Sequence, residues 1–361
     1  MSNLTTGILK LAKNGAGNLL DPAGSNHAIF VPASLIRQHN LPEGVTLTGP
    51  IQDVKQGPRL TAIETVCGLS PKAFQQRTTF GNLVAIDPVD RINLSITGDA
   101  SMRLIDLVAP IGKGTRGLIV APAKAGKTML LEKIAKAIKA DNPETRLVLL
   151  LIDERPEEVT HLRRSIKGAE VFASSSDRPP QEQIALSELL LAHIQAELEC
   201  GQHVVILVDS LTRLVRAFNL GGVTGRSRTM SGGVDAEALR IPRRFFGLAR
   251  NIEHGGSVTI LATILVDTGS RMDDFIFEEF KGTGNSEIVL DRSLAEAYIF
   301  PAINLLASGT RKEERLYDTD TGRKLIRLRR RLSDHPPREA LEWLLGLLDE
   351  FPTNEELLKS I

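Results

Sequence analysis

Gly117-Leu118-Ile119-Val120-Ala121-Pro122-Ala123-Lys124-Ala125-Gly126-Lys127-Thr128 joins a short apolar run to a tight loop that ends in Lys-Thr. The helix-forming segment Met129–Ala135 follows directly. A strand, such a loop and a helix in this order bind phosphate, because backbone N–H groups and the helix dipole face the phosphate oxygens. The first loop position is Ala121 rather than glycine, so the strict pattern is not met. The flanking strand and helix nevertheless favour nucleotide binding over a chance turn.

The loop predicts how a nucleotide would be held. The lysine of such a loop reaches the β and γ phosphates, and the residue after it binds Mg²⁺. We therefore expect ATP and Mg²⁺ as ligands, with Thr128 and Asp209 at the metal. The nucleotide-binding residues predicted in and after the loop are Lys124, Ala125, Gly126, Lys127, Thr128 and Met129.

Beyond about residue 101, apolar runs alternate with helical segments. Continuous apolar runs of this kind are typical of parallel strands that are buried on both faces. Their alternation with helices predicts an α/β domain over residues 101–361, ending in C-terminal helices. The expected strands are Gly117–Val120, Leu147–Ile152, Val204–Asp209, Val258–Thr263 and Glu287–Leu290.

Two of these strands lead into acidic residues. Asp209 ends its strand, and we expect it to hold Mg²⁺ through a water molecule. After the strand Leu147–Ile152, we choose Glu154 as the carboxylate that polarises the attacking water. Glu157 and Glu158 are expected to be acids of a helix start, where the helix dipole favours them.

The first hundred residues differ from the rest. Short apolar stretches such as His27–Val31 and Val45–Thr48 alternate with turn signals, among them Asn14-Gly15 and Asp21-Pro22. Short strands with frequent turns predict a small β-barrel or sandwich over residues 1–75. Residues 76–100 are expected to be a connector.

Composition excludes several classes of protein. The chain has 361 residues and 42% apolar residues, enough for a sizeable core, and 44 basic residues balance 44 acidic ones. A disordered chain and a uniformly basic nucleic-acid-binding surface are therefore excluded. Cys67 and Cys200 are too few for a disulfide scaffold. Without a signal peptide or a long apolar span, we expect a soluble, cytoplasmic protein with no membrane partner.

A string of motifs resembles the bacterial transcription termination factor Rho family. A weaker likeness over about residues 7–100, carried by Ile29–Ser34 and Ile36-Arg37, resembles that family's RNA-binding barrel; the family's N-terminal helical subdomain is expected to have no counterpart. Rotary and secretion ATPases share the core but lack Asp153–Thr160 and Lys281–Asn285 in this form. The motifs are Leu107–Gly114, the phosphate-binding loop, Ile152–Thr160, Asp209–Arg213, Gly232–Ala236, Arg244–Gly247, Glu278–Asn285 and Ser308–Glu314.

The resemblance implies a RecA-like P-loop ATPase domain with a small N-terminal OB-fold-like, cold-shock-like β-barrel. It implies a homohexameric, RNA-dependent ATPase and 5′-3′ RNA helicase that terminates transcription, with RNA, RNA polymerase and elongation factors as partners. Arg311 would be an arginine finger for the neighbouring subunit's site. Arg213 would lie near the γ-phosphate or the RNA, Phe300 would stack on adenine, Arg155 would contact the nucleotide, and Glu154 would be the catalytic glutamate.

Two loops resemble those that face RNA in the central channel of that family. One is the basic loop Gly221–Met230, in which Arg226 and Arg228 are the expected RNA contacts. The other is Lys281-Gly282-Thr283-Gly284, in which Lys281 would contact a phosphate. Without the resemblance, both would be interpreted as ordinary surface loops.

The barrel departs from the family pattern. Ala16 and Asn18 stand where that family has two aromatic platforms for RNA bases, and Tyr298 stands in place of an arginine. Phe30 is left as an RNA platform or as a core residue. An alternative function therefore stays open, a Rho paralogue with a weakened primary RNA site that acts as a repurposed ATPase or regulates transcription by binding RNA or a protein partner. The basic segment Arg323–Arg331 is interpreted as a solvated helix face or an interface.

Overall fold

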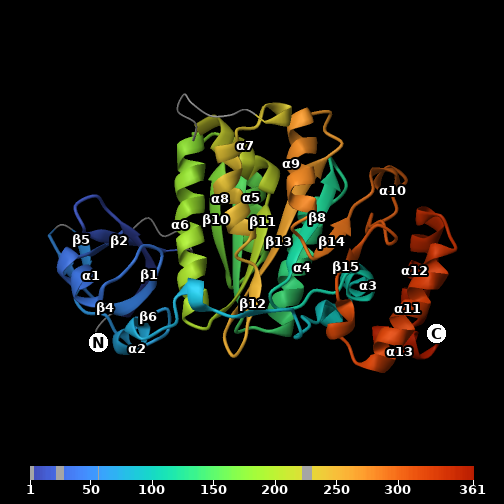
Figure 1. Ribbon diagram of the computed structural model, residues 1–361, viewed down its shortest axis with the longest axis horizontal. Helices are drawn as coiled ribbons and strands as arrows, with labels where there is room; N and C mark the ends of the chain where they lie inside the picture. The colour runs from blue at the N-terminus through green and yellow to red at the C-terminus, as the bar shows by residue number, and fades with distance from the viewer. Residues whose placement is uncertain (1–3, 22–27, 56, 222–229) are drawn as a thin grey trace.

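The computed structural model describes residues 4–21, 28–55, 57–221 and 230–361. The N-terminal barrel and the C-terminal helices lie at opposite ends of the long axis, with the sheet of the α/β domain between them (Figure 1). No helix within the described ranges is long and apolar enough to span a membrane.

The N-terminal part is a closed β-barrel. Its strands follow the order β1-β2-β3-β5-β4-β6, and antiparallel pairing of β1 with β4 closes it. Alternate residues such as Leu9, Leu19, Val31 and Leu47 point into its core, as the short alternating stretches predicted. Its elements are β1 (Leu4–Leu11), β2 (Gly17–Leu20), β3 (Ile29–Val31), α1 (Ala33–His39), β4 (Thr46–Val54), β5 (Gly57–Leu60), β6 (Thr65–Val66) and α2 (Pro71–Gln75).

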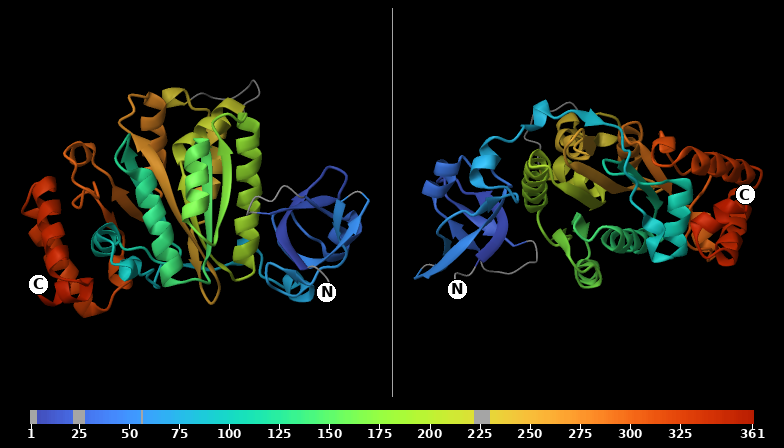
Figure 2. Two further views of the ribbon diagram at one scale, coloured as in Figure 1. Left: turned by 180° about the vertical axis from the view of Figure 1, so that it is seen from behind. Right: turned by 90° about the horizontal axis from the view of Figure 1, so that it is seen from below.

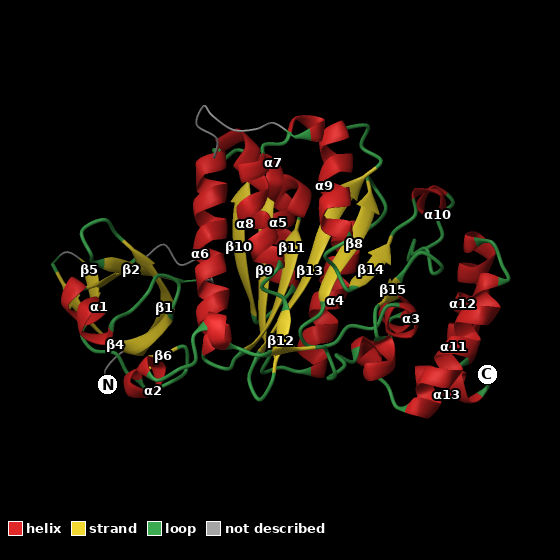
Figure 3. Cartoon of the chain, viewed as in Figure 1, coloured by secondary structure: helices red, strands yellow, loops and turns green. Residues whose placement is uncertain are grey.

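The central sheet has the strand order β10-β9-β11-β13-β8-β14-β15, and the six strands from β10 to β14 are parallel (Figure 3). All five strands expected from apolar runs are present. The strand β10 was not expected. The strands are β8 (Arg116–Pro122), β9 (Arg146–Glu154), β10 (Ala169–Ser175), β11 (His203–Asp209), β13 (Ser257–Val266), β14 (Ser286–Val289) and β15 (Gly309–Thr310), with β7 (Ala85–Ile86) and β12 (Arg250–Ile252) paired at one side.

Helices cover both faces of the sheet, because alternate strand residues are apolar on each side. One layer holds α3 (Ala100–Val108), α4 (Lys127–Asp141), α5 (Pro156–Ser165) and the C-terminal helices. The other holds α6 (Pro180–Glu199), α7 (Leu211–Gly221), α8 (Arg240–Phe246) and α9 (Arg271–Lys281) (Figure 2). The remaining helices are α10 (Arg292–Glu296), α11 (Thr319–Ser333), α12 (Pro337–Glu350) and α13 (Asn354–Lys359).

This topology creates a crevice at one end of the sheet. The neighbouring strands β8 and β13 are followed by helices on opposite faces, α4 on one and α9 on the other. Where the following helices diverge in this way, a crevice opens outside the carboxyl ends of the strands, and ligands bind there. The phosphate-binding loop and the end of β11 both lie at this edge.

The barrel packs against α6 through a buried polar network. The Thr46 hydroxyl donates to Glu197 Oε1 at 2.5 Å, and Arg146 pairs with Glu197 at 2.5 Å. Burial opposes ionisation of Glu197, but the Arg146 guanidinium, His193 and the Thr46 hydroxyl together outweigh burial and lower the pKa of that carboxyl. A Cβ on Gly44, whose φ is +89°, would lie 2.4 Å from the His193 backbone nitrogen. Close backbone contact and the hydrogen bonds between Thr46 and this ion pair therefore hold the barrel on the ATPase domain.

The basic segment Arg323–Arg331 lies in α11. Leu325, Leu328 and Leu332 of this helix are buried in the core, and Arg329 pairs with Glu313. The basic residues of this segment are explained by an amphipathic helix with a charged outer face. This agrees with the first of the two expected interpretations, a solvated helix face.

Candidate active site

The phosphate-binding loop has the backbone that its role requires. Lys124 and Gly126 adopt left-handed conformations, with φ of +64° and +88°, and α4 begins at Lys127. The loop thus turns sharply from the carboxyl end of β8 into the helix. Ala125 is buried inside the turn. The N-terminal N–H groups of α4 face the crevice, where a phosphate would accept them.

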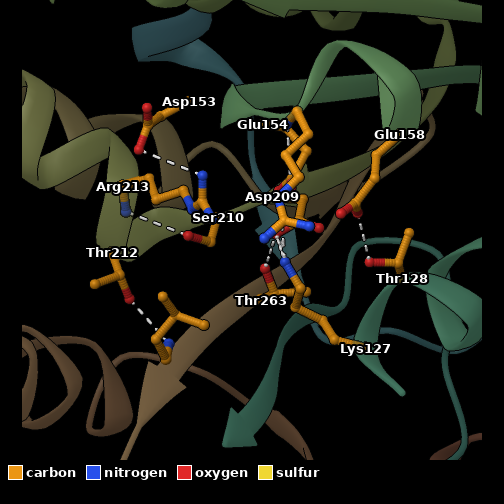
Figure 4. Close-up of polar contacts among 12 residues, drawn as sticks. Lys127, Thr128, Asp153, Glu154, Glu158, Asp209, Ser210, Thr212, Arg213 and Thr263 are labelled. Carbon is orange, nitrogen blue, oxygen red and sulfur yellow. Dashed lines mark hydrogen bonds and ion pairs between the residues drawn. The ribbon is translucent and has the colours of Figure 1, made fainter. Parts of the chain in front are cut away.

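Lys127 is held by two acidic side chains from neighbouring strands (Figure 4). Its Nζ contacts Asp209 Oδ1 and lies 3.7 Å from Glu154 Oε2. Strand order explains the meeting, because β9 and β11 are adjacent and both end at the crevice. The structure therefore brings together Lys127, Glu154 and Asp209, which are far apart in the sequence.

The two carboxylates are buried and incompletely satisfied. Glu154 is 4% exposed and Asp209 is 1% exposed. Glu154 Oε2 and Asp209 Oδ2 have no hydrogen-bond partner within the described part of the chain. Burial and the nearby Asp209 carboxylate raise the pKa of Glu154. Buried, unpartnered carboxylate oxygens are the donors that a hard divalent cation takes up, so these residues fit such an ion.

Sequence reasoning missed Thr263, which belongs to this cluster, and expected Glu158 only as an acid of a helix start. The Thr263 hydroxyl donates to Asp209 Oδ1 at 2.8 Å, from a strand whose other polar residues are Ser257 and Thr259. The Thr128 hydroxyl donates to Glu158 Oε2 at 3.2 Å. Glu158 does lie in the first turn of α5, as expected, but it also contacts a predicted nucleotide residue. The sequence offers only a weak signal for Thr263, a threonine near the carboxyl end of its strand, because Thr259 of the same strand does not belong to the cluster.

Arg213 lies beside the carboxylates rather than on the protein's far surface. Its Nη1 is 3.3 Å from Asp153 Oδ2, and Asp153 has a left-handed backbone with φ of +56°. The α7 helix begins next to Asp209 and carries Arg213 on its first turn. The guanidinium therefore lies at the crevice, where it pairs with Asp153, the residue before Glu154.

A small cavity beside the loop has room for a flat ring. Its volume is about 120 Å³, and Phe300 and Met129, which are 51% and 63% exposed, form part of its wall. Arg155 is exposed at the N-cap of α5, while Tyr298 is exposed near Phe300. The remaining wall residues are Ala100, Ser101, Ala125, Gly126, Leu130, Lys133, Leu290, Pro301 and Ala302.

Arg311 does not reach the phosphate-binding loop of its own chain. It follows β15, which pairs with Ser286 and Glu287 at the start of β14, and Ser286 lies opposite Gly117. The P-loop is at the other end of β8, whose seven residues span about 20 Å at about 3.3 Å each. Arg311 is exposed there and forms no ion pair within the described ranges.

Of the predicted RNA-contacting residues, those of the loop at residues 281–284 lie within the described part of the chain. Lys281 ends α9, and Gly282, Thr283 and Gly284 follow it near the start of β8. The next residue, Asn285, accepts the Arg311 backbone N–H at 2.8 Å, so this loop adjoins the arginine. Arg226 and Arg228 lie outside the described residues.

Phe30 faces outward on the barrel. It is 42% exposed, and strand register places it between Asn18 and Arg59. Lys10 lies beyond Asn18 in the same row. We name Lys10, Asn18, Phe30 and Arg59 the barrel row. Ala16, in contrast, is buried, so only one of the two positions without an aromatic faces solvent.

Comparison with known proteins begins with the ATPase domain. A family model of the ATP synthase alpha/beta family, nucleotide-binding domain, matches residues 101–310. A prototypical ATPase of the type III secretion system of pathogenic bacteria has a similar structure, with a TM-score of 0.66 and 20% identity over 86% of this chain and 92% of that one. These likenesses confirm the expected RecA-like fold of the ATPase domain.

Sequence relatives cover nearly the whole chain. Transcription termination factor Rho of Cereibacter sphaeroides is 45% identical over 98% of this chain and 86% of its own length. The Thermotoga maritima protein of that name is 48% identical over 98% and 84%. The Streptomyces lividans protein of that name is 48% identical over 92% of this chain. That relative is longer, and the match covers only 48% of its length. The chain belongs to the transcription termination factor Rho family.

Proposed function

We propose that this chain is an RNA-dependent ATPase that moves along RNA and terminates transcription in the cytoplasm. The meeting of Lys127, Glu154 and Asp209 beneath a phosphate-binding loop is the observation that carries the proposal. A chain that only bound nucleotide would not need a buried carboxylate with an open oxygen beside the phosphate site. The alternative of a repurposed regulator has no observation in its favour.

Each residue of the nucleotide site has its own role in ATP hydrolysis. Lys127 leaves Asp209 for the β and γ phosphates of ATP, and the loop N–H groups hold the remaining phosphate oxygens. Glu154 accepts a proton from the attacking water, for which its raised pKa suits it. Thr128 and Asp209 would hold Mg²⁺, which neutralises phosphate charge when bound. Phe300 stacks on the adenine, and Arg155 lies at the rim.

The site is completed by a second copy of the chain. Arg311 is too far from its own loop, yet it is exposed and unpaired among the described residues. A ring supplies it to the neighbouring P-loop, where an arginine finger accelerates phosphoryl transfer by about 10³–10⁵-fold. Arg213 acts from the same chain at the γ-phosphate. We take the ring to be a homohexamer.

In this proposal, RNA contacts two parts of the chain: the barrel, and the loops inside the ring. The barrel row offers one stacking surface between two cations, which suits single-stranded nucleic acid. Lys281 and the loop to Gly284, with Arg226 and Arg228, contact the strand inside the ring. Asn285, the residue after this loop, accepts the Arg311 backbone N–H, so the proposed RNA contact and the proposed arginine finger adjoin each other.

Strand displacement tests the proposal. An RNA with a pyrimidine-rich 5′ overhang is annealed to a labelled DNA strand and incubated with the protein and ATP. Release of the DNA strand is expected with the wild type and not with K127A. Release that continues without ATP, or none despite ATP hydrolysis, would contradict translocation.

A further inference from the structure

A groove of about 600 Å³ runs along the outer edge of the central sheet. Its floor is β10, the last strand on that side in the described chain. Its walls come from three separate places: Lys10 and Leu20 of the barrel, helix α5, and the start of α6. None of its residues belongs to the nucleotide site described above.

The groove gathers positive charge and hydroxyl groups. Lys10 of β1, Arg163 of α5 and Arg178 of the loop between β10 and α6 line it, together with Thr160 and Ser175. Glu182 also lines it, but it lies 4.0 Å from Arg178 with both side chains more than half exposed. Such exposed pairs are weak, so Glu182 leaves Arg178 available to another anion.

One hydroxyl in the groove lacks a partner. Ser174 is 5% exposed, and its Oγ has no hydrogen-bond partner within the described part of the chain. An enclosed hydroxyl of this kind costs free energy when it stays unpaired. Ser174 lines the groove, and its hydroxyl is shielded from solvent in the structure, so it would have to turn toward the groove to donate to a ligand with acceptor oxygens there.

The groove continues the barrel row. Lys10 ends that row, and it also lines the groove. A strand lying across Arg59, Phe30 and Asn18 therefore meets Lys10 and then the wall of the ATPase domain. A peptide could instead pair with the free edge of β10, but it would leave three converging cations without a role.

We infer that the groove binds the phosphate backbone of the RNA strand where it leaves the barrel for the ATPase domain. Lys10, Arg163 and Arg178 contact phosphates, and the Ser174 hydroxyl donates to one of their oxygens. This inference rests on the proposed RNA function and adds a subsite to it. It gives one common role to Lys10, Arg163 and Ser174, none of which belongs to the nucleotide site.

Binding of oligocytidine RNA tests the inference. Oligomers from about 4 to about 16 nucleotides, the range covered by one barrel of this kind, are titrated against the full chain by fluorescence anisotropy. The variants are R163A/R178A and S174A. The matched control is R164A, because Arg164 is the next residue of α5, is also exposed, and does not line the groove.

Long oligomers should lose affinity in R163A/R178A, while the shortest ones should not. Each lost phosphate contact lowers the salt slope by about 0.7, which at about 0.1 M salt is about fivefold in affinity. S174A should also weaken binding of long oligomers. An unused buried hydroxyl would behave differently, since its removal would stabilise the fold and leave binding unchanged.

The outcomes separate this inference from the function it rests on. If the wild type binds RNA and R163A/R178A binds every length equally well, the groove is not an RNA subsite and a peptide becomes its better occupant. If R164A is as impaired as R163A/R178A, general surface charge explains the effect and the inference fails. If the wild type binds no RNA, the proposed function itself fails.

Discussion

Replacing Glu154 with glutamine removes the proposed general base and keeps nearly the same side-chain shape. A positioned base contributes about 10²–10⁴-fold to a rate, so kcat for ATP should fall by at least about a hundredfold, or about 3 kcal/mol in activation free energy. ATP affinity should be nearly unchanged, because Lys127 and the loop still hold the phosphates. Steady-state hydrolysis with saturating RNA and nucleotide binding by equilibrium titration measure the two quantities.

The same variant has a predicted pH signature. The raised pKa of Glu154 lies above its ordinary value of 4.5, so wild-type kcat/KM should fall as the pH falls through that raised value. This acid limb should be absent from the residual activity of E154Q. The substitution has the opposite effect on stability. At neutral pH the charged, buried carboxylate of Glu154 lowers the free energy of unfolding, so E154Q should be more stable than the wild type. This difference in stability should vanish below about pH 4.5, where Glu154 is protonated in both the folded and the unfolded state.

Glu157→Gln is the matched control, since Glu157 is exposed in the first turn of α5, three residues from Glu154. It should hydrolyse ATP at the wild-type rate. Turnover by E154Q within tenfold of the wild type, or equal loss in E157Q, would refute the assignment of the base.

Arg311→Ala should be inactive alone, and mixing it with K127A should restore hydrolysis, because an intact loop then faces an intact arginine across some interfaces; absence of rescue would favour a role in its own chain. Asn18→Phe should tighten binding of pyrimidine-rich RNA by at least about 1 kcal/mol, the lower value for one stacked base. Ala16→Phe should instead lower Tm, because Ala16 is buried and overpacking costs about 1–3 kcal/mol. Phe300→Ala should raise KM for ATP by up to about tenfold with little change in kcat, as expected for lost stacking measured in steady-state assays.

The central strands could be predicted because each is largely an apolar run. In β11, for example, both faces are buried, and the polar residue Asp209 marks its end. The edge strand β10 could not be predicted in this way. It contains Glu170 and two serines, since one side faces the groove rather than another strand. Apolar patterning reports burial, and an edge strand is only half buried.

The candidate site could be predicted in part for a similar reason. Lys127, Glu154 and Asp209 were predicted because each stands at the carboxyl end of an apolar strand or in the loop. Thr263 depends on strand order, which the sequence alone does not give. The role proposed for Arg311 involves a neighbouring subunit, so only the family resemblance could suggest it.

RNA stimulation of ATP hydrolysis tests the central claim most directly. The purified protein is assayed with and without a pyrimidine-rich RNA at a low and a high salt concentration. The account predicts strong stimulation by RNA that weakens at high salt, because phosphate contacts release counterions. Hydrolysis that is indifferent to RNA at both salt concentrations, or no hydrolysis at all, would contradict it.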